Sequence, residues 1–190
     1  MDFSDTTRLY RQYSRAIGGL SASEPSYNGQ LVSEVEYRLE QLDFLLAKIR
    51  ELDQARIDFI NQPDPESRNM KFLRSNAFEI RLLTESFYHF AGRLRSIIRH
   101  KERPCPYLTG FECNGIRDVR NHLLEHPEGI NSRVFEWSWT IGGVEGPVLK
   151  AWREPSQAGT FPDCGLYPNA QELKANLEVV LGRALKAMRA

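Results

Sequence analysis

Apolar residues recur every three or four positions over most of the chain, a spacing that predicts a mainly α-helical protein. The strongest run predicts a helix from Ser33, which opens a capping box, to about Asn61. A second run predicts a helix from Asp64, an N-cap before Pro65, to about His100. At roughly 1.5 Å per residue each helix is longer than about 40 Å, and their short connection predicts an antiparallel hairpin.

Two further helices flank this hairpin in the sequence. A short helix over residues 5–17 is expected to end at a C-cap formed by the Gly18-Gly19 pair, so that residues 1–30 make an N-terminal arm and loop. The last helix begins with Asn169 as N-cap and carries an apolar stripe to the end of the chain.

Between the hairpin and the last helix the pattern changes twice. Thr109 opens a second capping box and a third helix, which Pro127 must stop at His126. Residues 134–141 then alternate apolar and polar positions, which predicts a strand. Glycines after it turn the chain into a partner strand over 148–152, so a β-hairpin insertion is expected over 130–155.

These elements predict one domain over residues 1–190, a length that suits a single hydrophobic core. The expected fold class is mainly α. It is a helical bundle built on a long antiparallel helix hairpin, with a small C-terminal β-hairpin and a final helix.

Charge and cysteine content narrow the classes of function. The chain has 25 Lys and Arg against 25 Asp and Glu, so no overall field attracts it to nucleic acid or to an anionic membrane. Its three cysteines form no CxxC pair, which favours reduced thiols over a disulfide framework or a zinc ribbon. No apolar run approaches the roughly 18 residues of a membrane span. We expect a cytoplasmic protein without a membrane partner, whose contacts with nucleic acid are local.

The candidate chemistry lies between Arg117 and His126, a segment with two arginines and half of the protein's 4 histidines. Its simplest interpretation is structural, because exposed helical charges usually form a solvated face. Asp118 and His122 lie one helical turn apart and can pair. His126, in the last turn, suits the negative end of the helix dipole.

The same segment resembles the R-x(4–6)-H signature of the HEPN superfamily, in which Asn, Asp or His commonly follows the arginine. Two registers fit this signature: Arg120-Asn121 before His126, and Arg117-Asp118 before His122. We prefer the first register, because Leu123 and Leu124 between its ends supply apolar positions that anchor the helix. The likeness covers the helical pattern from about Ser33 to Pro127.

The resemblance implies a helical bundle that binds RNA or cleaves it without a metal or other cofactor. Histidine would move the proton of the ribose 2′-OH or of the leaving oxygen, while arginine balances charge on the phosphate. In such proteins the motif helix commonly faces its twin across a two-fold axis, which implies a homodimer. The apolar stripes of the two long helices also favour a homodimer, because they exceed what one short third helix can cover.

Two alternatives stay open. The string from His122 to His126, with Glu125 between them, is also an H-x-x-E-H pattern in which two imidazoles bind the zinc of a hydrolase. Glu172 or Glu178 would then be the third ligand. The non-enzymatic alternative is a helical interaction or scaffold protein that binds a protein partner through the segment from Arg117 to His126.

Other residues have simpler interpretations. His89 is expected to be a packed or surface histidine, and His100 a partner of the helix dipole. A basic helix end, usually a solvated face, would extend an RNA-binding surface; it comprises Arg93, Arg95, Arg99, Lys101 and Arg103. At strict alternation, the aromatic stripe Phe135, Trp137 and Trp139 is more typical of a core face than of a base-stacking surface.

Overall fold

The structure, a computed structural model, describes residues 2–20, 29–62, 70–100, 105, 107–120, 133–138, 148–153 and 164–189. Its helices are α1 (Ser4–Leu20), α2 (Gly29–Ile60), α3 (Met70–Ile98), α4 (Asn114–Arg120) and α5 (Leu166–Ala187). Its strands are β1 (Arg133–Ser138), β2 (Val148–Arg153) and β3 (Cys164–Gly165). The prediction of a mainly α protein is therefore confirmed.

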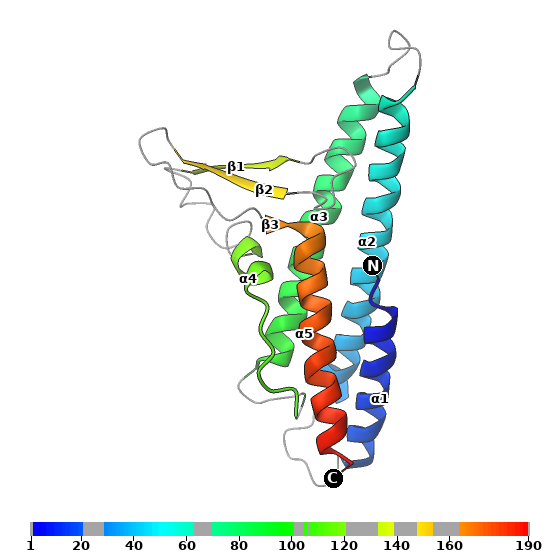
Figure 1. Cartoon of the computed structure of the whole chain (residues 1–190), viewed down its shortest axis with the longest axis vertical. Helices are drawn as coiled ribbons and strands as arrows, with labels where there is room; N and C mark the ends of the chain where they lie inside the picture. Colours follow the sequence, from blue (N-terminus) through cyan, green and yellow to red (C-terminus); the bar gives the residue numbers. More distant parts are fainter. Residues whose placement is uncertain are drawn as a thin grey trace.

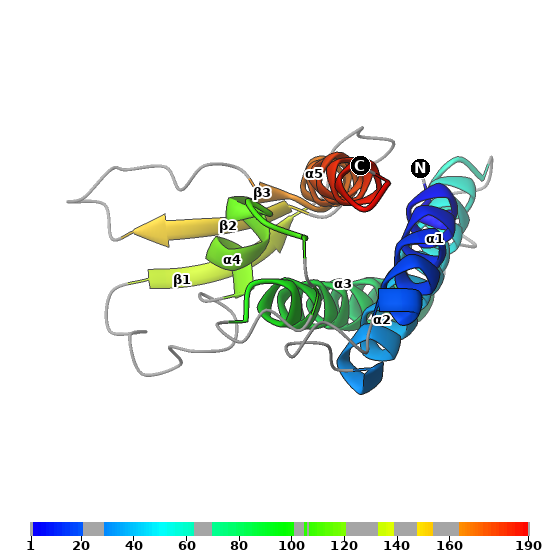
Figure 2. The ribbon, with the colours of Figure 1, turned by 90° about the horizontal axis from the view of Figure 1, so that it is seen from below.

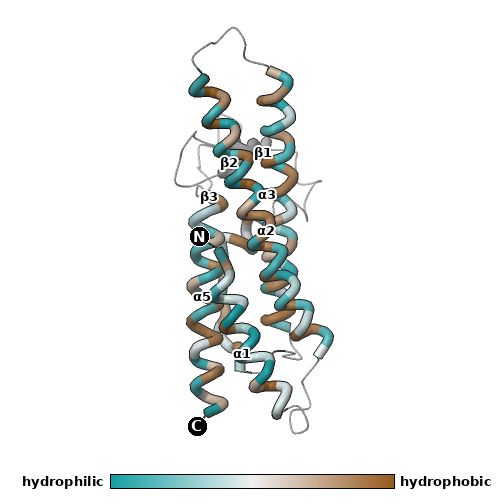
Figure 3. The backbone as a smooth tube through the Cα atoms, turned by 90° about the vertical axis from the view of Figure 1, so that its right-hand side faces the viewer, coloured by the Kyte–Doolittle hydropathy of each residue, from teal (hydrophilic) through white to brown (hydrophobic). Residues whose placement is uncertain are grey.

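The long helices α2 and α3, of 32 and 29 residues, run side by side in opposite directions (Figure 1). The guanidinium of Arg38 lies 4.9 Å from the centre of the Phe90 ring. Towards the other end of the pair, the rings of Phe59 and Phe72 lie 4.7 Å apart. Apolar and polar segments alternate along both helices, so each buries one stripe against the other (Figure 3).

Helices α1 and α5 cover only one half of the α2–α3 pair, which extends beyond them (Figures 1 and 3). Apolar side chains of α1 and of Phe3 just before it are buried in the common core: Phe3, Tyr10, Tyr13 and Ile17. The Tyr10 hydroxyl donates to the Val32 carbonyl of α2 at 2.8 Å. The Thr6 hydroxyl donates to Glu178 of α5 at 2.7 Å. The N-terminal segment is thus a member of the bundle rather than an arm beside it.

Two predicted helix boundaries are wrong. Helix α2 begins at Gly29, and the Ser33 hydroxyl donates back to the Gly29 carbonyl at 3.0 Å instead of capping a helix. Helix α1 does not end at the Gly18-Gly19 pair but continues to Leu20. The predicted start at Asp64-Pro65 lies outside the described residues. In α2, burial of Val32 stabilises the additional turn before Ser33.

Asn169 is also not the N-cap it was expected to be. Helix α5 starts at Leu166, with Gly165 as its N-cap, so Asn169 lies inside the helix. Its amide is buried and donates to the hydroxyl of Tyr88 on α3 at 2.9 Å. Since a buried amide without a partner is costly, this bond ties α5 to α3 at one position.

A three-stranded sheet in the order β1-β2-β3 projects from the side of the bundle (Figures 1 and 2). Strands β1 and β2 are antiparallel, with Phe135 opposite Ala151 and Trp137 opposite Leu149. Strand β3 pairs with β2 and leads directly into α5. The predicted continuation of the first strand over 139–141 lies outside the described residues.

Within the described ranges, no helix combines the length and the apolar character that a membrane span requires. Cys105 and Cys113 are free and buried. Burial raises the pKa of the Cys105 thiol to about 11 and that of Cys113 to about 12, so both are protonated at neutral pH. Neither is a candidate nucleophile.

The contribution of α1 to the core can be tested at Tyr13, whose ring is fully buried 5.5 Å from that of Tyr10. We expect Tyr13→Ala to lower the free energy of unfolding by about 3–5 kcal/mol, as for other aromatic rings removed from cores. Urea unfolding followed by circular dichroism measures the change. The exposed Arg15→Ala on the same helix should stay within about 0.5 kcal/mol of the native chain. Equal stabilities of the two variants would contradict this placement of α1.

Candidate functional site

The structure describes the side chains of two of the six predicted motif residues, Arg117 and Arg120, and the backbone of Asp118. Asn121, His122 and His126 lie outside the described residues, as does Glu125 of the H-x-x-E-H pattern. Neither register is therefore tested, and both stay predictions. The described part of the site is the helix that carries the two arginines and the surfaces that hold it.

Helix α4 is held close to α3 by the packing of Arg120 over Gly92. A Cβ added at the buried Gly92 would lie only 2.9 Å from Nε of Arg120. The Nε atom of Arg120 is itself buried. Because Gly92 has no side chain, the aliphatic part of the Arg120 side chain fits against α3 at this position. This contact sets the point along α3 where α4 packs.

The start of α4 is held in the same way by α5. A Cβ at Gly115 would lie 2.9 Å from Cγ of Asn169, whose amide is engaged with Tyr88. The backbone of α4 therefore approaches both α3 and α5 more closely than a residue with a side chain would allow. Two glycines and one buried amide position the helix.

The predicted capping box at Thr109 is wrong, because α4 begins only at Asn114. Gly110 has φ 71°, which reverses the chain where a helix would have continued. Helix α5 holds this segment in place from outside: Arg183 donates to the Thr109 carbonyl at 3.1 Å, and Asn176 donates to the Glu112 carbonyl at 2.9 Å. The segment before α4 is thus anchored on α5.

Positive charge gathers where α3 meets this segment. Arg99, which follows the last turn of α3, forms an ion pair with Glu112 at 2.6 Å. Arg95 is half-buried one turn earlier on the same face. Burial lowers the pKa of the Arg95 guanidinium below its usual value; Arg99 and Arg117 lower it further, against the opposite effect of Glu112. Arg95, Arg99 and Arg117, from here on the arginine cluster, therefore share one electrostatic environment.

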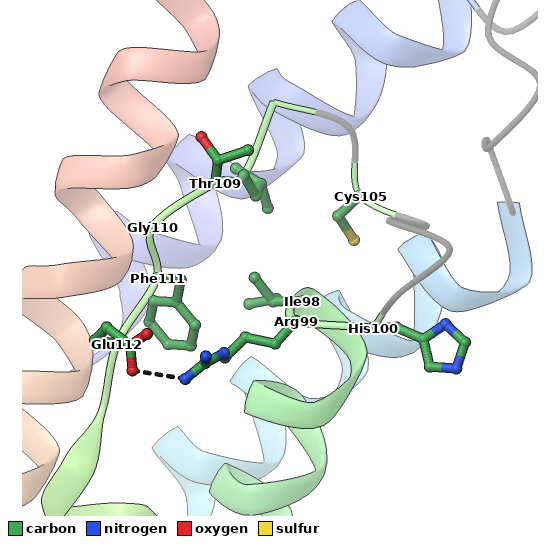
Figure 4. A pocket seen from close by; sticks show the side chains of 9 residues that line it. Ile98, Arg99, His100, Cys105, Thr109, Gly110, Phe111 and Glu112 are labelled. Carbon is green, nitrogen blue, oxygen red and sulfur yellow. Dashed lines mark hydrogen bonds and ion pairs between the residues drawn. The ribbon is translucent and has the colours of Figure 1, made fainter.

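A cavity of about 410 Å³ opens at the C-terminal end of α3, beside the ion pair (Figure 4). Its apolar lining comes from Ile98, Leu108 and Phe111, and its polar rim includes Arg99 and Glu112. Figure 4 shows the His100 imidazole pointing away from that ion pair. The cavity has the volume of a small-molecule site, and one of its walls is the ion pair itself.

The other candidate residues lie where they add little chemistry. His89 is exposed, with its ring edge-on to Phe90 at 5.5 Å, which fits the surface histidine expected there. Glu178, one suggested zinc ligand, accepts a hydrogen bond from Thr6. In the part of the chain that the structure describes, no three His, Cys, Asp or Glu side chains group so as to hold a metal ion. Lys101 and Arg103 lie outside that part.

Four residues that position the site were not recognised as doing so from the sequence: Gly92, Glu112, Gly115 and Asn169. Gly92 interrupts an apolar helical stripe, which signals a close approach to a neighbouring element. No sequence signal connects Glu112 with Arg99, because that contact depends on how the chain returns along α3. The basic end of α3 was recognised, but its relation to Arg117 was not.

Comparisons of the chain with protein-family models, curated proteins and solved structures find no match. The resemblance to the HEPN superfamily therefore depends on the motif and the helical pattern. An activity of that family in this chain is accordingly a proposal.

The contact between Gly92 and Arg120 predicts an unusual response to Gly→Ala substitution. Alanine in a helix interior normally stabilises by about 0.5–1 kcal/mol relative to glycine. At Gly92 we expect instead a loss of about 1–2 kcal/mol, because the new methyl group displaces the Arg120 side chain. Urea unfolding of Gly92→Ala measures this difference.

The matched control is Gly182→Ala on α5, where an added Cβ meets nothing within 4 Å. It should show the ordinary gain. In an Arg120→Ala background, Gly92→Ala should also stabilise, since the obstructing side chain is gone. A gain from Gly92→Ala in the native background equal to that from Gly182→Ala would show that Arg120 does not pack on Gly92.

Proposed function

We propose that this chain is a HEPN-like RNA-binding protein that cleaves single-stranded RNA without a metal and acts as a homodimer. The observation that carries the proposal is the placement of α4. This helix packs Arg120 against Gly92 of α3 and leaves Arg117 exposed, immediately before the segment of the sequence that contains His122 and His126. A helix held in place that carries arginines next to histidines in the sequence suits phosphodiester chemistry.

The proposed reaction is attack of a ribose 2′-oxygen on the adjacent phosphorus, with loss of the 5′-oxygen of the next nucleotide. A histidine takes the 2′-OH proton or gives a proton to the leaving oxygen, which its pKa near neutrality allows. An arginine stabilises the additional negative charge on the phosphate oxygens through its planar fork. The preferred pair is Arg120 and His126, followed by Arg117 and His122.

A second candidate function, a non-catalytic interaction protein, is favoured by an exposed apolar face on the α2–α3 pair. Tyr37, Phe44 and Leu82 are 54%, 61% and 51% exposed there. Tyr37 and Phe44 lie two turns apart on α2, and the antiparallel register brings Leu82 to the height of Phe44. These three residues are the outer apolar face. In Figure 2, α4 lies instead on the side of α3 that faces α5.

We propose that a second copy of the chain covers the outer apolar face. Two ion pairs near it, Lys48 with Glu51 and Arg81 with Glu85, bring equal numbers of positive and negative charges. A two-fold contact requires such self-complementarity, because each surface meets its own copy. Because α4 lies on another side of α3 (Figure 2), a dimer through this face would not bring the two motif helices together in the way that the HEPN resemblance implies; this contact therefore favours the interaction protein.

The nuclease proposal predicts that the purified protein cleaves single-stranded RNA in the presence of EDTA. His126→Ala should lower the rate by about a hundredfold or more with the fold retained, because general acid–base catalysis contributes at least that much. Loss confined to His122→Ala would move the site to the register of Arg117. Gel analysis of a labelled RNA with circular dichroism of each variant makes the measurement.

His89→Ala is the matched control, because this imidazole is exposed on α3 and belongs to neither register. It should cleave like the native protein. Activity abolished by EDTA and restored by zinc would favour the H-x-x-E-H hydrolase. A folded protein with no activity on RNA or peptide, with or without zinc, would contradict catalysis and leave the interaction protein.

The homodimer proposal predicts that Phe44→Glu converts a dimer into a monomer, because the carboxylate would be buried without a partner in the interface. Light scattering coupled to size exclusion measures the mass. Val179→Glu on α5 is the matched control, since Val179 is 59% exposed on another helix. A Phe44→Glu variant that stays dimeric, with Arg117→Glu monomeric, would place the interface at α4 instead.

A further inference from the structure

The contacts between α3 and the segment around α4 form an antiparallel series. Arg120 packs over Gly92 at one end, and Glu112 pairs with Arg99 at the other. Between them, Arg117 and Arg95 lie one helical turn from these contacts, and the charge of Arg117 acts on Arg95. The arginine cluster therefore extends along the contact between α3 and α4, the helix that carries the two motif arginines.

This cluster concentrates positive charge around a buried donor. Glu112 is the carboxylate paired with Arg99, and the pair is exposed, so it contributes little to stability. The Nε of Arg95 is buried and, within the described part of the chain, has no hydrogen-bond partner. That buried atom cannot itself reach a ligand, but the half-buried Arg95 guanidinium next to two exposed arginines gives a local excess of positive charge that favours an anion with several acceptor oxygens.

Phosphate fits this arrangement better than a carboxylate does. Arginine forks bind phosphate oxygens in pairs, and one phosphate can accept from more than one guanidinium. Arg95 and Arg99 are four residues apart, a rise of about 6 Å along α3. A row of charges at this spacing follows a polymer with regularly placed phosphates rather than a single small anion.

We propose that Arg95, Arg99 and Arg117 bind the phosphate backbone of single-stranded RNA beside the motif, and that Glu112 holds Arg99 until RNA replaces it. The choice of RNA rests on the proposed function. The site itself consists of residues outside either motif register, apart from Arg117. Glu112 acts as a competitor: it keeps Arg99 extended in the free protein and lowers the affinity for the strand.

The test is equilibrium binding of a fluorescein-labelled 2′-O-methyl oligouridylate, which cannot be cleaved through its 2′-oxygen, measured by anisotropy from about 50 to 200 mM salt. Arg99→Gln and Arg117→Gln should each weaken binding about tenfold. Each should reduce the salt slope by about 0.7, the value for one phosphate contact to a single strand. Glu112→Gln should tighten binding about two- to fivefold, because it releases Arg99.

The chain offers matched controls in the exposed Arg8–Asp5 pair on α1, a helix that carries neither the cluster nor the outer apolar face. Arg8→Gln and Asp5→Asn should bind like the native protein. If the native protein binds and Arg99→Gln and Arg117→Gln match Arg8→Gln, the proposed site is wrong although RNA binding stands. No binding by the native protein, or tighter binding of a polyglutamate peptide through the same arginines, would also overturn it.

The outcome is separable from that of the nuclease proposal. Arginine-dependent binding of the 2′-O-methyl strand, without cleavage of unmodified RNA, would support the site and reject catalysis. Cleavage of RNA by a protein whose binding ignores Arg99, Arg117 and Glu112 would do the opposite. Thermal unfolding of each variant excludes a folding defect, since Arg99, Arg117 and Glu112 are all exposed.

Discussion

The structure depends on the burial of one apolar stripe between α2 and α3. These helices are longer than the elements that cover them, so α1 and α5 complete a four-helix core over only one half of the pair. In the other half, α2 and α3 pack mainly against each other. There the buried amide of Asn76 on α3 donates to the Leu52 carbonyl of α2 at 2.8 Å. Helix α4 meets α3 in the covered half, where α5 supplies the second wall. The candidate site is thus located by the extent of the bundle core.

Within that covered half, close packing sets the electrostatics. Gly92 and Gly115 let α4 approach its neighbours, and the approach brings Arg117 towards the arginines of α3. Like charges would separate if the helix were loosely attached. The unfavourable proximity of the arginines is offset by burial elsewhere on α4, where Ile116 and Val119 are fully buried. Apolar packing therefore holds together a charge arrangement that an anionic ligand would stabilise.

Periodicity in the sequence was sufficient to predict the mainly α class, because a stripe that must be buried leaves a regular spacing. Helix ends were less predictable. Ser33 and Asn169 have the chemistry of N-caps, but their side chains bond to a carbonyl inside the same helix and to Tyr88 on another helix. Thr109 does not cap a helix, because the chain turns at Gly110 instead. A cap is a local interaction, and tertiary partners that the sequence does not reveal competed for the same side chains.

The candidate site was also only partly predictable, because tertiary contacts decide the environment of each motif residue. The motif, taken along one segment, offers Arg120 and Arg117 as alternatives with a preference for Arg120, and the fold gives the two arginines different environments. Arg120 is half-buried against Gly92, so its loss changes packing as well as charge, whereas Arg117 is exposed in the arginine cluster. Inactivity after substitution of Arg120 would thus not identify a catalytic arginine. The register has to be decided at His122 and His126, and the role of Arg117 by its effect on binding.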